Sequence, residues 1–347
     1  MSTEPTRPVD VLIASPLRPE HVELIAAVDP RVRVHYAPDL LPVPAHAADH
    51  TGTPRELTAE QRRRWRDLLA VAEVSFGLDW SDPAAMPANC PRLRWVQGTS
   101  AGMGGYLAAV DLLDADFAIT TAAGVHGRPL AEFAVAGVLH FVKDVPGLLA
   151  DKAEHRWVRR LTAQLAGRRV LVVGLGGIGR EMVAVFAALG AEVRGIGRAG
   201  RGYDIPDLAE TRSFEDLDGA LPDTDVLVLC CPLTEQTTGL LSRARLDLLP
   251  RQAIVVNVAR GAVLDEPALL DALRSGRLAG ACLDVVATEP LPADSPVWDT
   301  PNLLLSPHSA ANAAEENERI VTLFAQNLLR YLAGRPLRNL FDPARGY

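Results

Sequence analysis

Cysteine is scarce in this chain of 347 residues. The four cysteines include the neighbours Cys230 and Cys231, and they match neither a disulfide framework nor the spacing of a metal site. The chain also lacks an apolar run of membrane-spanning length, and its first residues lack the apolar core of a signal peptide. Its net charge of −8 disfavours nucleic acid or an anionic membrane as the main partner. We therefore expect a cytoplasmic protein that has no metal site and binds neither nucleic acid nor membrane.

The length of the chain exceeds what one core comfortably supports and predicts two domains. In the first 121 residues, short apolar stretches alternate with helical periodicity, which is typical of a parallel sheet. Thr58 and Gln61 have the spacing of a capping box, which would begin an Arg-rich helix with a solvated face. The predicted strands of this part are residues 9–14, 32–36, 72–77, 93–97 and 117–121.

The stretch from Val170 to Arg180 is the most informative one. Four apolar residues predict a buried strand, and Gly174, Gly176 and Gly179 then follow at the G-x-G-x-x-G spacing that opens a helix. In a dinucleotide site these glycines permit a tight turn, the approach of a pyrophosphate, and close packing of the helix on the strand. The alternative is a structural turn that binds nothing. We expect a dinucleotide site that includes Gly174, Gly176, Gly177, Ile178 and Gly179, followed by a strand at residues 191–196.

Four further apolar stretches predict the rest of a second parallel sheet, at residues 225–230, 253–258, 281–285 and 303–306. Arg260, Glu289 and His308 follow the last three of them, and ligands of such sheets bind outside the carboxyl ends of the strands. Singly, these could be a surface arginine, a loop acid and a structural histidine. Beside a dinucleotide they suit hydride chemistry on a hydroxy acid, because a guanidinium can hold a carboxylate and an imidazole oriented by a carboxylate can exchange a proton.

Three other segments carry expectations. The N–H groups of Gly98 to Gly105 could face an anion, although a flexible connection would have the same glycine-rich composition. The helix expected at residues 130–142 is apolar nearly all round, which predicts burial on two sides, in part against another subunit. Asn312 and Glu315 have the spacing of a second capping box and predict the start of a helix that runs to about Ala333.

Shorter motifs accompany the glycine stretch from about Trp95 to the C-terminus. They are Ser100-Ala-Gly-Met, Ala131-Glu132, Trp157, Pro232-Leu-Thr with Thr238, Asn257-Val-Ala-Arg-Gly, Leu283-Asp-Val with Glu289-Pro-Leu-Pro, and Ser306-Pro-His. In this order they make the chain similar to the D-isomer-specific 2-hydroxyacid dehydrogenase family. The first ninety residues resemble that family only in their alternation of strands and helices.

The resemblance implies an α/β fold of two Rossmann-like, flavodoxin-like domains, each built on a doubly wound parallel sheet, with a cleft between them. Residues 1–121 plus 313–347 would form a discontinuous substrate domain. Residues 122–312 would form the dinucleotide-binding domain. The family also implies a homodimer, paired through the region of the helix at 130–142.

The resemblance further implies a role for each matching residue. Arg260 would bind the substrate carboxylate and carbonyl, His308 would be the acid and base, and Glu289 would be the partner of His308. The backbone around three residues of the other domain would hold the carboxylate: Ser100, Ala101 and Gly102. Asp284 would contact the nicotinamide amide. The other residues expected along the cofactor are Cys231, Pro232, Val258, Ala259, Arg260 and His308.

One departure from the family concerns the cofactor. Members that use NAD end the second strand of the dinucleotide unit with an Asp for the ribose hydroxyls, whereas this chain has Gly197 there, followed by Arg198 and Arg201. A small residue beside guanidinium groups suits the 2′-phosphate of NADP, which carries nearly two negative charges. The alternative is that both arginines are simply exposed and Asp204 contacts the ribose of NAD. We expect NADP(H) to be preferred, with NAD possible.

The sequence therefore predicts an oxidoreductase that transfers a hydride between NADP(H) and a 2-oxo acid or D-2-hydroxy acid. The expected direction is reduction, and the arrangement resembles the glyoxylate and hydroxypyruvate reductases of the family. One alternative is a non-catalytic protein that senses the dinucleotide on the same fold, as in the transcriptional corepressors of the family. Another is a formate or phosphonate dehydrogenase.

Overall fold

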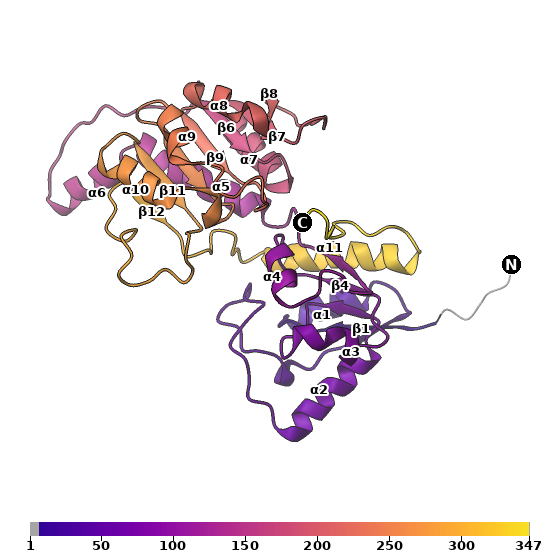
Figure 1. The fold of residues 1–347 in the computed structure, drawn as a ribbon. Helices are drawn as coiled ribbons and strands as arrows, with labels where there is room; N and C mark the ends of the chain where they lie inside the picture. The colour runs from indigo at the N-terminus through magenta and orange to yellow at the C-terminus, as the bar shows by residue number, and fades with distance from the viewer. Residues whose placement is uncertain (1–6, 347) are drawn as a thin grey trace. The chain divides into compact units, whose positions relative to one another are not determined.

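The computed structural model describes residues 7–346, and these form two compact units (Figure 1). The first unit contains residues 7–125 and 312–346, and the second contains residues 126–311. Each unit is built on one parallel sheet with helices, so the predicted α/β class is confirmed. Every strand predicted from the sequence is present, with ends within two residues of the predicted ones.

The first unit has a five-stranded sheet in the order β2-β1-β3-β4-β5, in which all neighbours are parallel. This is a doubly wound order: β2 is added on one side of β1, and β3 and the later strands are added on the other side. Its strands are β1 (Val9–Ile13), β2 (Val32–His35), β3 (Val74–Phe76), β4 (Trp95–Gln97) and β5 (Ala118–Thr120). Its helices are α1 (Pro19–Ala26), α2 (Ala59–Val71), α3 (Met86–Asn89), α4 (Gly104–Ala109) and α11 (Glu316–Leu332).

The core of this unit includes a helix from the far end of the chain. Phe324 of α11 stacks on Trp95 of β4, with ring centroids 5.0 Å apart, and meets Phe76 of β3 edge to face at 5.3 Å. Such aromatic contacts add to the free energy gained by burying the rings. The C-terminal segment is therefore an integral layer of the first unit.

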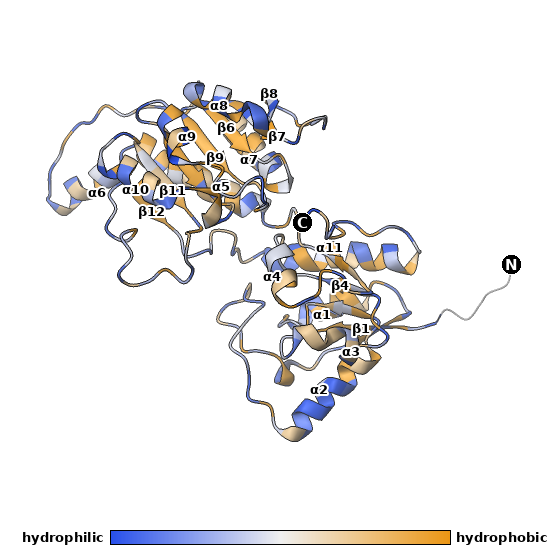
Figure 2. Ribbon diagram, in the orientation of Figure 1, coloured by the Kyte–Doolittle hydropathy of each residue, from blue (hydrophilic) through white to orange (hydrophobic). Residues whose placement is uncertain are grey.

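The two capping predictions have different outcomes. The capping box of Thr58 and Gln61 is confirmed at the start of α2, whose arginine-rich face is exposed and hydrophilic (Figure 2). The box predicted at Asn312 and Glu315 is wrong, because α11 begins at Glu316 without a side-chain cap. The Asn312 amide lies 3.4 Å from His46 instead, at the point where the chain enters the first unit, and is not available to the helix.

The second unit has a seven-stranded parallel sheet in the order β12-β11-β10-β9-β6-β7-β8. Alternate residues of β6 contribute to separate cores on its two faces, Leu171 and Val173 to one and Val170 and Val172 to the other. Its strands are β6 (Arg169–Val173), β7 (Glu192–Gly197), β8 (Leu208–Ser213), β9 (Val226–Leu229), β10 (Ile254–Asn257), β11 (Gly280–Leu283) and β12 (Leu303–Leu305). Its α-helices are α5 (Gly127–Val142), α6 (Val145–Ala153), α7 (Gly177–Ala188), α8 (Leu217–Ala220), α9 (Arg243–Leu248) and α10 (Glu266–Arg274).

Helix α5 packs closely on this sheet. A Cβ atom on Gly137 would lie 2.3 Å from the sulfur of Cys282 in β11, so only glycine permits this approach. Within the described chain one face of α5 is fully buried, whereas Phe133, Val135 and Leu139 are only half-buried. No single helix within residues 7–346 is long and apolar enough to cross a membrane; α5 and α6 meet that test only as a pair bent by 62°.

The edge strand β8 has no counterpart in the sequence analysis. Its residues, Leu208 to Ser213, are mostly polar and largely exposed, so they lack the apolar run that predicts a buried strand. It pairs with β7 through an irregularity between Val193 and Arg194. The strand exists because the backbone of β7 offers it hydrogen bonds, not because of its own apolar pattern.

Candidate active site

In the glycine turn of the second unit, the geometry requires two of the three glycines. Gly174 has a φ of 107°, and a Cβ atom there would lie 2.7 Å from the backbone nitrogen of Cys231. A Cβ atom on Gly179 would lie 2.0 Å from the carbonyl oxygen of Gly174, so this position requires glycine for packing. Gly176, the N-cap of α7, has no described atom within 4 Å of an added Cβ.

The difference between Gly176 and the other two glycines is what a dinucleotide-binding turn would show. Packing explains Gly174 and Gly179, but nothing within the described chain requires glycine at Gly176, where a pyrophosphate would need to approach the backbone. The N–H groups at the start of the twelve-residue helix α7 point to that same opening, beginning at Gly177. Gly176 and Gly177 are exposed and Ile178 is half-buried, so the turn remains accessible.

The residues after β9 lie against this turn. The Cys230 thiol lies 3.2 Å from the carbonyl oxygen of Gly174, and the backbone of Cys231 is the nearest obstacle to a side chain on Gly174. Burial raises the pKa of the Cys231 thiol to about 12, so this thiol is neutral at ordinary pH. Cys231 therefore packs against the glycine turn, and the predicted contacts of Cys231 and Pro232 with the cofactor stay a prediction.

The histidine and the glutamate predicted to act together are hydrogen-bonded. Nδ1 of His308 lies 2.7 Å from Oε2 of Glu289, and Oε1 of Glu289 accepts the N–H of Val286 at 3.1 Å. Because a carboxylate accepts, Nδ1 carries the hydrogen and Nε2 is the atom that can exchange a proton. The His308 side chain is exposed, so that atom can be reached by a small molecule.

Asp284 has a role in this arrangement that the sequence did not reveal. Its side chain is buried, and Oδ1 accepts three hydrogen bonds from the segment after β12: from the Ser306 hydroxyl at 2.7 Å and from the N–H groups of Ser309 and Ala310 at 2.9 Å. Its carbonyl oxygen accepts the N–H of His308 at 2.8 Å. His308 has a φ of 54°, a left-handed conformation that this carboxylate helps to hold.

Arg260 is brought to the same edge of the sheet by its neighbours. Asn257, at the end of β10, donates to the carbonyl oxygen of Arg260 at 3.1 Å and accepts the N–H of Ala259 at 3.0 Å. A Cβ atom on Gly261 would lie 1.9 Å from the carbonyl oxygen of Val286, so glycine lets this loop lie against the loop that carries Glu289. Since β12, β11 and β10 are adjacent and parallel, the three predicted catalytic residues follow neighbouring strand ends.

Gly197, at the end of β7, is buried, Arg198 is half-buried and Arg201 is exposed. Asp204, the alternative ribose contact, is exposed, and its carbonyl oxygen accepts a hydrogen bond from Arg180. The ring of Tyr203 lies against Gly197, a contact that the sequence did not predict. The only sequence signal of Tyr203 is that it is the sole aromatic residue between β7 and β8.

In the first unit, the segment after β4 is held in place. The carbonyl oxygen of Ser100 accepts the N–H of Ala122 at 2.9 Å, and the buried side chain of Met103 lies where a Cβ atom on Gly98 would be. Ser100 and Gly102 are exposed at the carboxyl end of β4, between these anchors. Ser100, Ala101 and Gly102 thus lie at the sheet edge where ligands of such sheets bind.

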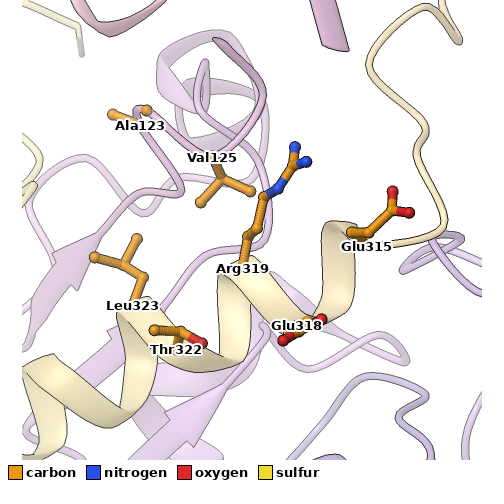
Figure 3. A pocket seen from close by; sticks show the side chains of 8 residues that line it. Ala123, Val125, Glu315, Glu318, Arg319, Thr322 and Leu323 are labelled. Carbon is orange, nitrogen blue, oxygen red and sulfur yellow. The ribbon is translucent and has the colours of Figure 1, made fainter. Parts of the chain in front are cut away.

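A separate hollow of about 510 Å³ lies in the first unit beside the start of α11 (Figure 3). The side chain of Arg319 extends from α11 past Val125 in Figure 3, and the hollow is also lined by Glu315 and Glu318. None of the predicted site residues lines it. Two carboxylates against one guanidinium make it a poor site for an anionic oxo acid.

Comparison with known proteins identifies the family. Residues 135–310 match the family described as D-isomer specific 2-hydroxyacid dehydrogenase, NAD binding domain. The chain is also 31% identical over 279 residues to a glyoxylate/hydroxypyruvate reductase A of Salmonella newport (strain SL254), which covers 79% of this chain and 88% of that relative. The chain belongs to the D-isomer specific 2-hydroxyacid dehydrogenase family.

Two solved structures extend the similarity to 98% of the chain. One from Xanthobacter autotrophicus Py2, in complex with NADPH and MES, is 31% identical with a TM-score of 0.77 and covers 98% of this chain and 100% of that one. An NADPH-dependent glyoxylate/hydroxypyruvate reductase from Sinorhizobium meliloti, in complex with NADP and sulfate, is 26% identical with a TM-score of 0.77 and the same coverage. The predicted family is confirmed, and this chain is an NAD(P)-dependent oxidoreductase of 2-hydroxy and 2-oxo acids.

Proposed function

We propose that this dehydrogenase reduces a short 2-oxo acid, of the glyoxylate or hydroxypyruvate type, with NADPH. The observation that carries the proposal is the hydrogen-bonded pair of His308 and Glu289, on the same sheet edge as Arg260. The glycine turn with its open position at Gly176 supports a dinucleotide beside it. The substrate named for the Salmonella and Sinorhizobium relatives supports the choice of oxo acid.

Each catalytic residue has one task in this proposal. A bound nicotinamide supplies the hydride. Nε2 of His308 donates a proton to the carbonyl oxygen of the substrate, while Glu289 holds Nδ1–H and stabilises the charged imidazole. Arg260 binds the substrate carboxylate with its planar guanidinium and stabilises negative charge on the reacting oxygen.

The remaining assignments follow the family pattern. Residues 1–121 plus 313–347 form the substrate domain, in which the backbone at Ser100, Ala101 and Gly102 holds the substrate carboxylate. Residues 122–312 form the cofactor domain. There, Asp284 holds the His308 loop and would contact the nicotinamide amide. The other cofactor contacts are the glycine turn, Cys231, Pro232, Val258 and Ala259.

The preference for NADPH rests on the end of β7. Gly197 supplies no acid for a ribose hydroxyl, and Arg198 and Arg201 supply positive charge for a 2′-phosphate. Both the Xanthobacter and the Sinorhizobium structures were solved with NADPH or NADP, which supports the same preference.

The assembly we propose is a homodimer in the cytoplasm. Helix α6 and the segment that follows it expose apolar side chains that the described chain does not cover, and Trp157 is 96% exposed. Such a patch is typical of a protein interface. All four cysteines are free and buried, which suits a reducing compartment.

A steady-state assay tests this function. Glyoxylate, hydroxypyruvate, pyruvate and phenylpyruvate are each offered with NADPH and with NADH, and loss of the reduced-nicotinamide absorbance is followed. The expected result is turnover of glyoxylate or hydroxypyruvate that favours NADPH. Turnover that favours NADH would overturn the cofactor preference alone. Binding of the dinucleotide without turnover of any oxo acid would favour the sensor.

A further inference from the structure

The end of β7 has no room for the acidic side chain that NAD would require. A Cβ atom on Gly197 would lie 2.4 Å from Cε2 and 2.8 Å from the hydroxyl oxygen of Tyr203. Both distances are far below the contact distance of carbon and oxygen atoms. Position 197 therefore lacks an acidic side chain and also lacks the space for one, because the ring of Tyr203 fills the space beside Gly197.

The same tyrosine contacts the segment that carries both arginines. Its hydroxyl oxygen accepts the main-chain N–H of Arg198 at 2.8 Å, which fixes the backbone where β7 ends. The guanidinium carbon of Arg201 lies 5.3 Å from the centroid of the Tyr203 ring, within the range of a cation–π interaction. One phenol thus restrains the first arginine through its backbone and the second through its charge.

This segment is also tied to the helix that begins at the glycine turn. Arg180, in the first turn of α7, donates from Nη1 to the carbonyl oxygen of Asp204 at 2.7 Å. Ile205 is buried in the same core as the residues of α7. Tyr203 immediately precedes these two anchors. Its position is thereby set relative to the place where a pyrophosphate would bind.

We propose that Tyr203 is a specificity-determining residue that selects NADP(H) over NAD(H). It occupies the space that an acidic partner of a ribose diol would need, and it holds Arg198 and Arg201 in one short segment as the counter-charge for a 2′-phosphate. This inference rests on the proposed preference for NADPH and adds the residue that creates it. It also implies that an acid at position 197 is excluded as long as the tyrosine is present.

The experiment compares kcat and KM for NADPH and NADH, with glyoxylate as the oxo acid, in the wild type, Tyr203→Phe and Tyr203→Ala. Tyr203→Ala should lower the NADPH-to-NADH ratio of kcat/KM by about tenfold, mainly through the KM for NADPH. Tyr203→Phe loses only the hydrogen bond to Arg198 and should lower the ratio by about threefold. Calorimetry should show the affinity for 2′,5′-ADP, relative to that for 5′-AMP, falling in the same order of variants. This measurement does not depend on turnover.

A double variant tests the steric part of the proposal. Gly197→Asp alone should fold poorly or bind neither dinucleotide well, whereas Gly197→Asp combined with Tyr203→Gly should bind NADH better than NADPH. Arg212→Ala, which removes a half-buried arginine of β8 paired with Glu210, is the control for the change of net charge that Gly197→Asp makes.

The outcomes separate this inference from the proposed function. A wild type that does not favour NADPH overturns the cofactor preference and the role of Tyr203 with it. A wild type that favours NADPH, together with Tyr203 variants that keep its ratio and its 2′,5′-ADP affinity, overturns the role of Tyr203 alone. If Tyr203→Ala does not fold, Tyr203→Phe and its 2′,5′-ADP affinity decide the question.

Discussion

Nδ1 of His308 lies 2.7 Å from Oε2 of Glu289, and the other oxygen of that carboxylate is held by the backbone of Val286. The glutamate therefore cannot turn away from the imidazole without losing its own anchor. An imidazole held in this way keeps one tautomer, with Nε2 as the atom that exchanges protons. The pair is the central feature of the catalytic site that we propose in the second unit.

Replacing His308 by glutamine should remove the acid and base while preserving the shape of the site. General acid–base catalysis contributes roughly 100-fold or more, so we expect kcat to fall by at least that factor. The dissociation constant of NADPH, measured by fluorescence titration, should change little. The exposed His155 provides the control, His155→Gln, which should retain full turnover. A His308→Gln enzyme with wild-type turnover would remove the assigned role.

Asp284 should be needed for activity because it positions the loop of His308. Asp284→Ala leaves the N–H groups of Ser309 and Ala310, two half-buried residues, without an acceptor, which should cost roughly 1–3 kcal/mol of the free energy of unfolding. It should also lower kcat by more than tenfold at a temperature where the protein remains folded.

A variant of a helix cap in the same unit separates the loss of stability from the loss of kcat that we expect for Asp284→Ala. Asp265 caps α10 by accepting the N–H of Ala268 at 3.0 Å. Asp265→Ala should cost about 1 kcal/mol of the free energy of unfolding without loss of kcat. Equal losses of kcat in both variants would reduce the role of Asp284 to general stability.

The glycine turn gives a prediction in which neighbouring glycines behave differently. Gly179→Ala would place a methyl group 2.0 Å from the carbonyl oxygen of Gly174 and should destabilise the protein by roughly 3 kcal/mol or more. Gly176→Ala places its methyl group in open space and should leave the melting temperature almost unchanged. It should raise the KM for NADPH at least tenfold, because the methyl group blocks the pyrophosphate. Unchanged KM in a folded Gly176→Ala enzyme would contradict the predicted cofactor position.

The sequence alone was sufficient to place residues of a suitable chemical type that directly follow a predicted strand. Arg260, Glu289 and His308 could be placed on one sheet edge because each follows an apolar stretch that reads as a parallel strand. The glycine spacing likewise predicted the turn before α7, since the local geometry requires Gly174 and Gly179 and a bound pyrophosphate would require Gly176.

The remaining features depend on contacts between distant segments. Strand β8 has a polar sequence and forms only because β7 offers it a partner. Tyr203 and Gly197 are six residues apart, and no rule of spacing indicates that one fills the space beside the other. The start of α11 was misplaced because Asn312 contacts His46, a residue that precedes it by more than 260 positions.

Asp151 should control the order of the segment that follows α6. Hydrogen bonds from Arg160 and Arg156 hold the pKa of the Asp151 carboxyl below its usual range. Since the folded pKa lies below the unfolded one of about 3.9, the stabilisation is complete above that value and is lost as the pH falls through the lowered pKa. Hydrogen exchange, corrected for intrinsic rates, should therefore show the hydrogen-bonded amides of His155, Arg156 and Ala163 protected at pH 7 and losing protection below about pH 4.

A variant makes the same test at neutral pH. Asp151→Asn should speed tryptic cleavage after Arg156 and Arg160, because the amide can no longer hold both guanidiniums. Asp218→Asn, which loses a single ion pair with Arg245, is the control. It should be cleaved after Arg156 and Arg160 at the wild-type rate. Equal cleavage rates in Asp151→Asn and the wild type would show that the ion pairs do not order this segment.

The apolar side chains of α6 and of the segment that follows it should form the subunit interface of the proposed dimer. Leu149 is more than half exposed and Leu161 fully exposed, and each would lose contact with water in a subunit interface. Introducing a charge there, as Leu149→Asp with Leu161→Asp, should raise the dimer dissociation constant by at least 100-fold in sedimentation velocity. Leu329→Asp changes a comparably exposed leucine of α11 in the other unit and should leave the sedimentation coefficient at that of the wild type. A double variant that sediments as the wild type would place the subunit contact elsewhere, because two buried and unpaired carboxylates are too costly for an interface to tolerate.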